Sequence, residues 1–366
     1  MNSSIQSAFI LGSGRCGSTL LSEMLNTHPR MLSVSEFFAF ITDIGSHIDK
    51  AFTETELNGV EFWDLISGVY IKQNLLQKHN VAMKEMIYPF NEDSMFTKES
   101  GLPAIMQTTL PHLSLEHDAL FQDLETEITC WEKRDIIEQY QNLFCWLARK
   151  YGNQMWIERS GGSLRIAGQL YQSFPKSKFV HLVRDGRDTA ISMSRHFGFR
   201  MALLSFQFIE ILGFDPYLSD RRDFDPQSIG ELIHFLPENF DGDRFRKLEF
   251  PTEVFAAYWS GEICNGVKEL EEIPVDQVMT MRFEDFIDQP KKSIDRLFRF
   301  LDTESVDERL FHQLAEMVGK PNSSWQSLEK GEIASLNAAC KPGFDALADV
   351  GIFYDREQDD SDHGSR

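Results

Sequence analysis

The chain alternates short apolar runs with longer stretches in which apolar residues recur at helical spacing. Residues 8–11 are apolar and end at a glycine-rich turn, which predicts a buried strand. Residues 18–26 follow with helical spacing. This helix is expected to end at His28 and Pro29, because a residue before proline avoids the helical region. Residues 31–34 predict a second strand.

The same alternation returns in the second half of the chain. Further strands are predicted to end at 156–157 and to cover 178–183 and 276–282, and helices to cover 164–174, 188–197, 252–271 and 291–301. Residues 37–151 are mostly helical in pattern, with loop signals near 91–111, and residues 199–242 are predicted to be irregular after an apolar start. Strands that alternate with helices predict an α/β fold, with a parallel sheet and helices on both faces.

The domain organisation follows from the absence of an internal repeat and of a low-complexity linker, which predicts one domain over residues 1–354. Composition agrees, because 42% of the 366 residues are hydrophobic and 25% are charged, as is ordinary for a globular chain with a large core. The polar segment 355–366 is predicted to be a disordered acidic tail.

The charge balance bears on the partners. The chain has 36 basic and 57 acidic residues, a net charge of -21. Such a surface repels nucleic acid and other polyanions at long range, which disfavours sulfated or phosphorylated polymers as substrates. An anionic ligand then needs a local cluster of arginines. The alternative, that the acidity only aids solubility, stays open.

The cysteines and the N-terminus bear on the compartment. Five scattered cysteines without metal-ligand spacing predict free thiols in a reducing compartment and no metal site. They are Cys16, Cys130, Cys145, Cys264 and Cys340. The N-terminal apolar run is too short for a signal peptide, and no stretch approaches the roughly 18 apolar residues that span a bilayer. We therefore expect a cytoplasmic protein without a membrane span.

Residues 12–19, GSGRCGST, have the spacing GxxxxG followed by Ser and Thr, between a predicted strand and a predicted helix. The glycines let successive N–H groups turn inward and the helix adds its positive end, so the segment suits a phosphate. Ser18 stands where a Walker loop has lysine, which disfavours ATP or GTP and favours a shorter 5′ anionic chain without an obligatory metal. A tight turn without a ligand is the alternative. The candidate ligand-binding residues are Gly14, Arg15, Cys16, Gly17, Ser18 and Thr19.

A second candidate site follows the strongly apolar strand predicted at 178–183. Arg184 stands at its carboxyl end, where open parallel sheets bind ligands, and its guanidinium can grip a phosphate in a fork geometry. Ser192, on the next helix, can donate to the same phosphate. Arg187 and Asp188 are expected to form a structural pair.

These two segments, GSGRCGSTLL with NTHP after it and LVRDGRDTAISMSR, resemble the donor-binding motifs of sulfotransferases that use 3′-phosphoadenosine 5′-phosphosulfate (PAPS). The first resembles the 5′-phosphosulfate loop and the second the 3′-phosphate site. WIERS and MRFEDFIDQP follow in the order of the branch that includes tyrosylprotein and many bacterial sulfotransferases. The resemblance implies a P-loop-like sheet. It divides the chain into a donor-binding core, about 8–36, 156–195 and 275–301, and acceptor or lid insertions, about 37–151 and 199–252.

The resemblance also implies three catalytic residues. Arg15 is expected to contact the 5′-phosphosulfate, backed by Ser18 and Thr19. Glu36, 21 residues after Arg15 (36 − 15), stands where the tyrosylprotein branch has its catalytic glutamate and is expected to be the general base; a helix-opening glutamate is the alternative. Arg159 stands where the family commonly has lysine.

An arginine at position 159 can stabilise developing charge but cannot donate a proton at ordinary pH, and a surface ion pair with Glu158 is the alternative for it. Two histidines of the variable region, His112 and His117, are the other candidates for the base. His28 and His181 are expected to be structural.

Two features outside the motifs each allow two interpretations. Trp325 could stack on adenine or pack in the core, and the apolar segment 201–214 could cap an acceptor pocket or form a buried helix. The sequence thus predicts an enzyme that moves a sulfuryl group by in-line displacement from PAPS to a hydroxyl or amine of a small molecule, lipid or peptide. The alternatives are a P-loop kinase of small metabolites and an inactive nucleotide-binding module. Neither the acceptor nor the oligomeric state follows from the sequence.

Overall fold

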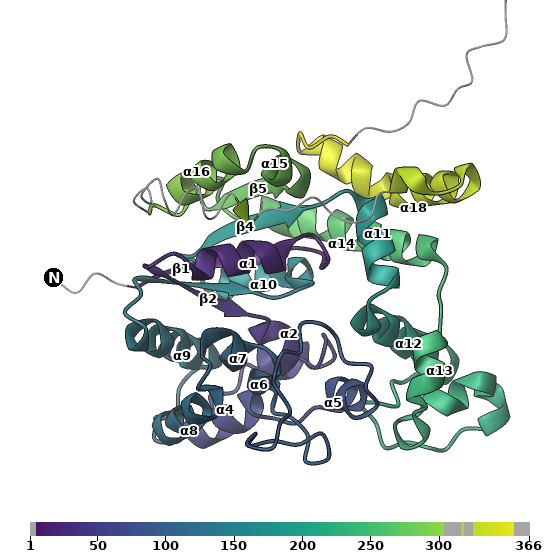
Figure 1. The fold of residues 1–366 in the computed structure, drawn as a ribbon, viewed down its shortest axis with the longest axis horizontal. Helices are drawn as coiled ribbons and strands as arrows, with labels where there is room; N and C mark the ends of the chain where they lie inside the picture. Colours follow the sequence, from purple (N-terminus) through teal and green to yellow (C-terminus); the bar gives the residue numbers. More distant parts are fainter. Residues whose placement is uncertain (1–4, 304–315, 318–324, 355–366) are drawn as a thin grey trace, which may run out of the picture.

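The computed structural model of the protein describes residues 5–303, 316–317 and 325–354. The predicted acidic tail, 355–366, lies outside the described residues. Five strands form one parallel sheet in the order β2-β3-β1-β4-β5 (Figure 1). The strands are β1 (Gln6–Leu11), β2 (Met31–Ser35), β3 (Met155–Arg159), β4 (Lys178–Val183) and β5 (Val278–Arg282).

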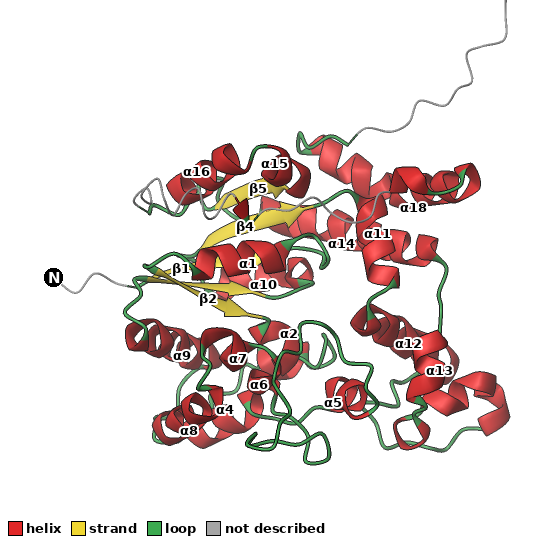
Figure 2. Cartoon of the chain, in the orientation of Figure 1, coloured by secondary structure: helices red, strands yellow, loops and turns green. Residues whose placement is uncertain are grey.

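Helices cover both faces of this sheet (Figure 2). Ala8 and Ile10 of β1 pack into one core, while Phe9 and Leu11 pack into the other, as the two-residue period of a strand requires. The predicted α/β fold, a parallel sheet between helical layers, is confirmed. The first core includes residues of α1 (Ser18–Asn26), α15 (Phe283–Asp288) and α16 (Pro290–Phe300); the second includes residues of α9 (Ile136–Lys150), α10 (Ala167–Ser173) and α14 (Thr252–Glu271).

The first insertion is helical, as predicted, apart from its middle. Residues 79–103 carry no helix or strand, but the predicted loop near 91–111 is wrong at its end, where Ala104–Gln107 form a buried helix against α2. Burial of this apolar turn outweighs the helix-breaking effect of the prolines before and after it. Besides α9, the helices of the first insertion are α2 (Phe37–Ile41), α3 (Ile48–Ala51), α4 (Gly59–Ile66), α5 (Ile71–Lys78), α6 (Ala104–Gln107), α7 (Thr109–Leu113) and α8 (His117–Ile128).

The second insertion begins with a long helix, α12 (Phe197–Leu212), where the sequence predicted irregular structure. Met201, Leu204 and Phe208 are buried on one side of it, so the reading of segment 201–214 as a core helix is right for that side. Short helices complete the insertion: η2 (Pro226–Phe235), η3 (Pro237–Asn239) and α13 (Gly242–Lys247).

Two further helices and two 3₁₀ turns complete the described elements. Helix α11 (Gly186–Ser194) begins before the predicted residue 188, because Asp185 caps it by accepting a 2.9 Å hydrogen bond from the Arg187 N–H group. Helix α18 (Lys330–Asp349), which the sequence did not predict, packs along α14 despite a proline inside it. The segments η1 (Ser163–Ile166) and η4 (Trp325–Ser327) are single 3₁₀ turns.

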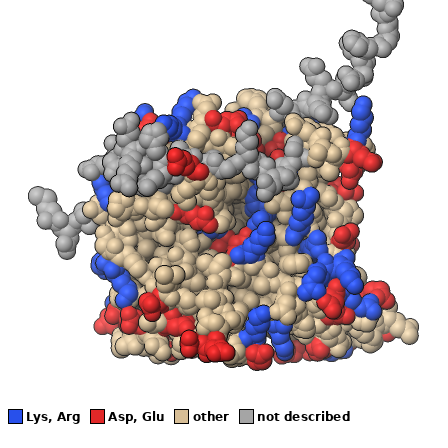
Figure 3. Space-filling model, in the orientation of Figure 1, with Lys and Arg blue, Asp and Glu red and all other residues tan. Residues whose placement is uncertain are grey.

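Within the described ranges, none of the helices combines the length and apolar character that a bilayer span requires. The same ranges hold no cluster of three or more histidine, cysteine or acidic side chains arranged to bind a metal ion. Basic and acidic side chains both border the hollow near the middle of the face drawn in Figure 3.

Candidate functional site

The loop between β1 and α1 has a backbone that only certain residues allow. Gly14 and Gly17 have φ values of 82° and 92°, and Arg15 between them also has positive φ, at 56°. A Cβ atom on Gly17 would lie 2.1 Å from the Phe283 ring, and one on Gly14 would lie 2.6 Å from the Phe199 ring. The two glycines therefore serve both the left-handed turns and the close packing of the loop.

A cavity of about 590 Å³ opens beside this loop, a size typical of small-molecule sites. Loop residues line it together with Arg184, Ser192 and Glu36. The Cys16 side chain does not, because it is buried in the core under Gly12, where burial raises the pKa of its thiol. The loop residues in the wall are Gly14, Arg15, Gly17, Ser18 and Thr19.

Two residues predicted to bind the anionic ligand, Ser192 and Arg184, both contact Arg15 of the loop. The Arg15 Nε atom donates to the Ser192 hydroxyl at 3.2 Å, and the Arg184 guanidinium donates to the Arg15 carbonyl at 3.4 Å. Arg184 also lies over the Phe283 ring and 3.9 Å from the Asp188 carboxylate. Residues from two distant segments thus form one cationic corner of the cavity.

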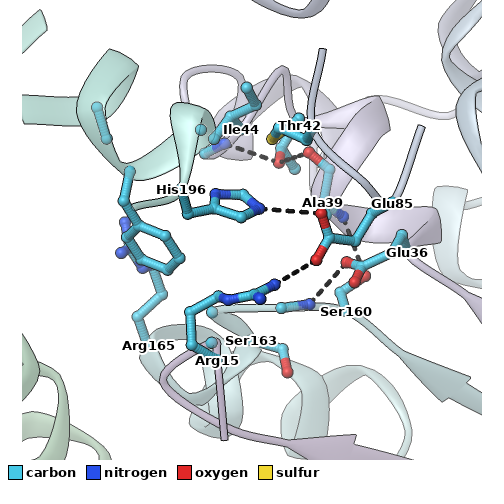
Figure 4. Close-up of a pocket in the computed structure, with 18 of the residues that line it drawn as sticks. Arg15, Glu36, Ala39, Thr42, Ile44, Glu85, Ser160, Ser163, Arg165 and His196 are labelled. Atoms are coloured by element: carbon cyan, nitrogen blue, oxygen red, sulfur yellow. Dashed lines mark hydrogen bonds and ion pairs between the residues drawn. The ribbon is translucent and has the colours of Figure 1, made fainter. Parts of the chain in front are cut away.

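Glu85 and His196 join this corner, and the sequence had singled out neither. The Glu85 carboxylate forms an ion pair with Arg15 and a 2.9 Å hydrogen bond with His196 Nε2 (Figure 4). Burial alone raises the pKa of Glu85, but the His196 hydrogen bond and the charges of His196 and Arg15 outweigh it and lower the pKa to about 2. Glu85 is therefore ionised at neutral pH. His196 follows the RDGR helix closely, whereas the irregular stretch around Glu85 carries no signal.

Glu36 and Arg159 form a second arginine–carboxylate pair. Glu36 is the N-cap of α2 with φ of 55°, its Oε2 accepts a 2.8 Å hydrogen bond from the Gly161 N–H group, and its Oε1 pairs with Arg159. Arg159 is buried, also donates to the Ser35 hydroxyl at 2.6 Å, and lies behind Glu36 rather than in the cavity wall. The alternative prediction of a surface ion pair between Arg159 and Glu158 is therefore wrong. Glu36 both begins a helix, as one prediction had it, and faces the cavity, as the other requires.

Glu158 lies on β3 next to that pair and is fully buried. One of its oxygens accepts hydrogen bonds from the Ser160 hydroxyl at 2.5 Å and the Phe38 N–H group at 3.3 Å. Burial, with the Glu36 charge adding to it, raises the pKa of Glu158 to about 8. Glu158 is therefore mainly protonated at neutral pH, so Arg159 faces one carboxylate rather than two.

The four histidines of the sequence analysis lie outside the cavity wall. His28 Nδ1 accepts from the Arg30 N–H group at 3.2 Å, and His181 lies inside β4, where burial lowers its pKa to about 4, so both are structural as predicted. Burial and the Arg159 charge lower the pKa of His112 to about 4. His117 packs its ring against Tyr88 instead.

Arg187 and Asp188 have structural roles at the start of α11, as predicted, but each makes its hydrogen bonds to another partner. Arg187 pairs with Asp185 at 2.6 Å, because both side chains are held at the start of α11, and its guanidinium stacks on Trp325 at 3.5 Å from the ring centroid. Asp188 instead accepts a 2.9 Å hydrogen bond from the Trp325 N–H group. Trp325 is buried against this cluster and is absent from the cavity wall, in agreement with the core-packing reading.

Both insertions contribute to the cavity wall. Helix α12 contributes Ala202, Ser205, Phe206 and Ile209, and the segment after α2 contributes Ile44, Gly45, Ser46 and Ile48. Segment 201–214 therefore has a buried side and a side that lines the cavity. The remaining wall residues from the insertions include Lys72, Met83, Asp215 and Leu218.

Several solved sulfotransferases are similar to the chain, but at TM-scores near 0.4 we draw nothing further from the likeness. The sulfotransferase domain of the curacin biosynthetic pathway is 14% identical (TM-score 0.41), with 91% of this chain and 83% of that chain covered. A sulfotransferase from Alicyclobacillus acidocaldarius is 15% identical (TM-score 0.41; 94% and 95% covered), and one from Mycobacterium avium is 12% identical (TM-score 0.40; 97% and 78% covered). None of the curated protein sequences matches.

The family assignment rests on the sequence profile of the sulfotransferase family, which matches residues 7–225. This match covers more than half of the chain. It begins in β1, just before the phosphate loop, and extends through α11 and α12. The chain therefore belongs to the sulfotransferase family.

Proposed function

We propose that this protein transfers the sulfuryl group of PAPS to a hydroxyl of a small, mainly apolar acceptor. One observation carries the proposal. A single cavity joins the phosphate loop, Arg184 and Ser192 to Glu36 and to apolar walls from both insertions. Donor-type cations and a candidate base thus border the same space as side chains suited to an alcohol.

The donor end of the cavity fits a ligand with phosphate at both ends. Arg15, Ser18 and the positive end of α1 suit the 5′-phosphosulfate, and Arg184 with Ser192 suits the 3′-phosphate. Bound there, the donor supplies an activated sulfuryl group and a phosphate leaving group. Ser18 in place of a lysine at the end of the loop counts against the alternative, a P-loop kinase.

Glu36 is the proposed general base. Its carboxylate lines the cavity, and the ion pair with Arg159 and the hydrogen bond from Gly161 hold it in place before the reaction. A proton taken from the acceptor hydroxyl neutralises Glu36 and weakens its hold on Arg159. The charge of Arg159, which lies behind Glu36, is then no longer compensated, and it favours the negative charge that develops on the leaving phosphate without contacting it.

Several predictions from the sequence remain part of this proposal: one domain over residues 1–354, a cytoplasmic location and no binding of nucleic acid. The five cysteines are unpaired, which agrees with a reducing compartment.

Binding of the product nucleotide 3′-phosphoadenosine 5′-phosphate (PAP) tests the proposal. Calorimetry should give a micromolar or tighter Kd for the wild type, and Arg184→Ala and Arg15→Ala should each weaken binding at least about tenfold, the usual effect of losing a charge-assisted contact. Lys341→Ala, at an exposed ion pair of α18, is the matched control. No PAP binding, or equal binding by all variants, would refute a donor site here.

Transfer itself is tested with PAPS and a metabolite extract. A compound that gains the mass of one SO₃ unit only with active protein identifies the acceptor. Tight PAP binding without transfer across a broad panel would favour the inactive nucleotide-binding module instead.

A further inference from the structure

A buried ion pair lies in the cavity wall on the side formed by the two insertions. The Lys72 Nζ atom of α5 lies 2.7 Å from the Asp215 carboxylate, which follows α12, and donates to the Ser46 hydroxyl at 2.6 Å. All three residues line the cavity. Helix α5 lies apart from α1 in Figure 1, and Asp215 follows the end of α12 opposite to Phe199, the residue that packs against Gly14 of the phosphate loop.

Stability alone does not explain this pair. Both side chains are only 6% exposed, and a buried pair loses so much hydration that apolar replacements are often as stable. The Asp43 carboxylate lies behind it, fully buried, and accepts 3.3 Å hydrogen bonds from the Lys72 and Gln73 N–H groups. Three charges are thus gathered at the wall of a ligand-sized cavity, which points to recognition.

The Ser205 hydroxyl gives a second, independent sign of a ligand. Ser205 lies on the cavity side of α12 and is only 4% exposed. Its oxygen has no hydrogen-bond partner among the described residues. A buried hydroxyl is rarely left without a partner, since this costs free energy that a ligand hydroxyl can recover.

The walls near these polar groups are apolar. Ile44 and Ile48 line the cavity near Ser46, and Ala202, Phe206 and Ile209 of α12 line it near Ser205 in the sequence. Phe206 and Ile209 are also 48% and 43% exposed, so the apolar wall extends to the surface. The occupant therefore needs an apolar body between its two polar ends.

The charge and the hydrogen-bonding capacity of this part of the wall determine which polar group a ligand can place there. Asp43 and Asp215 against Lys72 sum to a charge of −1 when all three are ionised, which repels a carboxylate or sulfate. The Lys72 ammonium repels a second ammonium. A hydroxyl both donates and accepts, and so suits the Ser46 and Ser205 hydroxyls and a further N–H group of Lys72.

We infer that the acceptor is an amphipathic alcohol with a second hydroxyl group, remote from the one that receives the sulfuryl group, which binds among Lys72, Ser46 and Ser205. This inference rests on the proposed function, since it takes the cavity to be the acceptor site. It adds a chemical class that the phosphate loop and Glu36 leave open.

The test uses linear α,ω-alkanediols of increasing length against 1-alkanols of the same lengths, titrated into the full-length protein with and without PAP. We expect one diol length to bind about tenfold more tightly than its alkanol, the gain of about two hydrogen bonds. ω-Amino alcohols and ω-hydroxycarboxylates of that length should show no such gain. Equal affinity of diols and alkanols at every length overturns the inference.

Variants locate the effect. Ser205→Ala should reduce the diol advantage at least threefold and leave alkanol binding within twofold, and the double variant Lys72→Met with Asp215→Leu should abolish the advantage. The exposed pair of Lys341 and Asp345 offers the control, Lys341→Met. A diol advantage that survives in both folded variants also overturns the inference. Absence of PAP binding would instead refute the proposed function, whereas the inference is judged on the alcohol titrations.

Discussion

Arg15 of the phosphate loop forms an ion pair with Glu85, a residue 70 positions further along the chain. The Arg159–Glu36 pair repeats this arrangement, and Figure 4 shows the Glu36 side chain next to that of Glu85. Both arginines that the family resemblance assigns to catalysis thus have a carboxylate partner. Only Arg15 of the two lines the cavity, so an anionic donor has to share Arg15 with the Glu85 carboxylate or displace that carboxylate.

The Arg15–Glu85 pair leads to the first prediction. Glu85→Gln keeps a hydrogen-bond acceptor for Arg15 but removes the competing negative charge, so we expect PAP to bind about fivefold more tightly, the effect of roughly 1 kcal/mol. Calorimetry at constant ionic strength measures this. Glu262→Gln is the matched control, because Glu262 pairs with another cavity arginine, Arg165, and the net charge changes equally. Weaker PAP binding by a folded Glu85→Gln protein would contradict the prediction.

Glu36 should matter for transfer and much less for donor binding. We expect Glu36→Gln to lower the transfer rate by about 10²–10⁴-fold, the usual contribution of a general base, with PAP affinity changed by less than about fivefold. The glutamine still accepts hydrogen bonds from Arg159 and Gly161, so thermal unfolding should remain cooperative. Full turnover by a folded Glu36→Gln protein would assign the base to another group.

Glu158 should make the stability of the protein depend on pH. Burial raises the pKa of Glu158 from its ordinary value of 4.5 to about 8 on folding, so the folded state binds one more proton than the unfolded state between these pH values. The contribution of Glu158 to stability is then fully present below about pH 4.5 and is lost as the pH rises through about 8. Glu158→Gln mimics the protonated form and removes this dependence.

Urea unfolding at several pH values measures the free energy of unfolding of the wild type and of Glu158→Gln, and the prediction concerns the difference between the two. Relative to wild type, Glu158→Gln should gain on the order of 2–4 kcal/mol between pH 5 and pH 8. Using the difference removes the contributions of other titrating groups. A difference that stays constant over this range would show that Glu158 is not protonated in the folded protein.

The loop glycine Gly17 supplies a test of the fold around the site. We expect Gly17→Ala to destabilise the protein by about 2–4 kcal/mol, because its φ is 92° and the added Cβ meets the Phe283 ring. Gly261→Ala, in the middle of α14 with no atom within 4 Å of the added Cβ, should instead stabilise by about 0.5–1 kcal/mol. Similar unfolding free energies for the two variants would argue against a strained, tightly packed loop.

The local sequence pattern was sufficient to predict several elements in and around the candidate site. The bounds of α1, β4 and α14 agree with the sequence prediction, since each has a strong apolar period and a clear start or stop. It was not enough for α6 or the start of α12. These helices owe their form to burial against other elements, and their short or wholly apolar sequences do not distinguish helix from loop.

The sequence by itself determined the parallel α/β sheet, the glycine-rich loop with Ser18 in place of lysine, and the position of Arg184 at a strand end, because each depends on residues close together in the chain. Only the tertiary structure decided which charges meet: Arg15 with Glu85, Arg159 with Glu36, and Lys72 with Asp215. These partners come from distant, mostly irregular segments. Their pairing depends on how the insertions pack over the carboxyl edge of the sheet, where burial makes an unpaired charge costly.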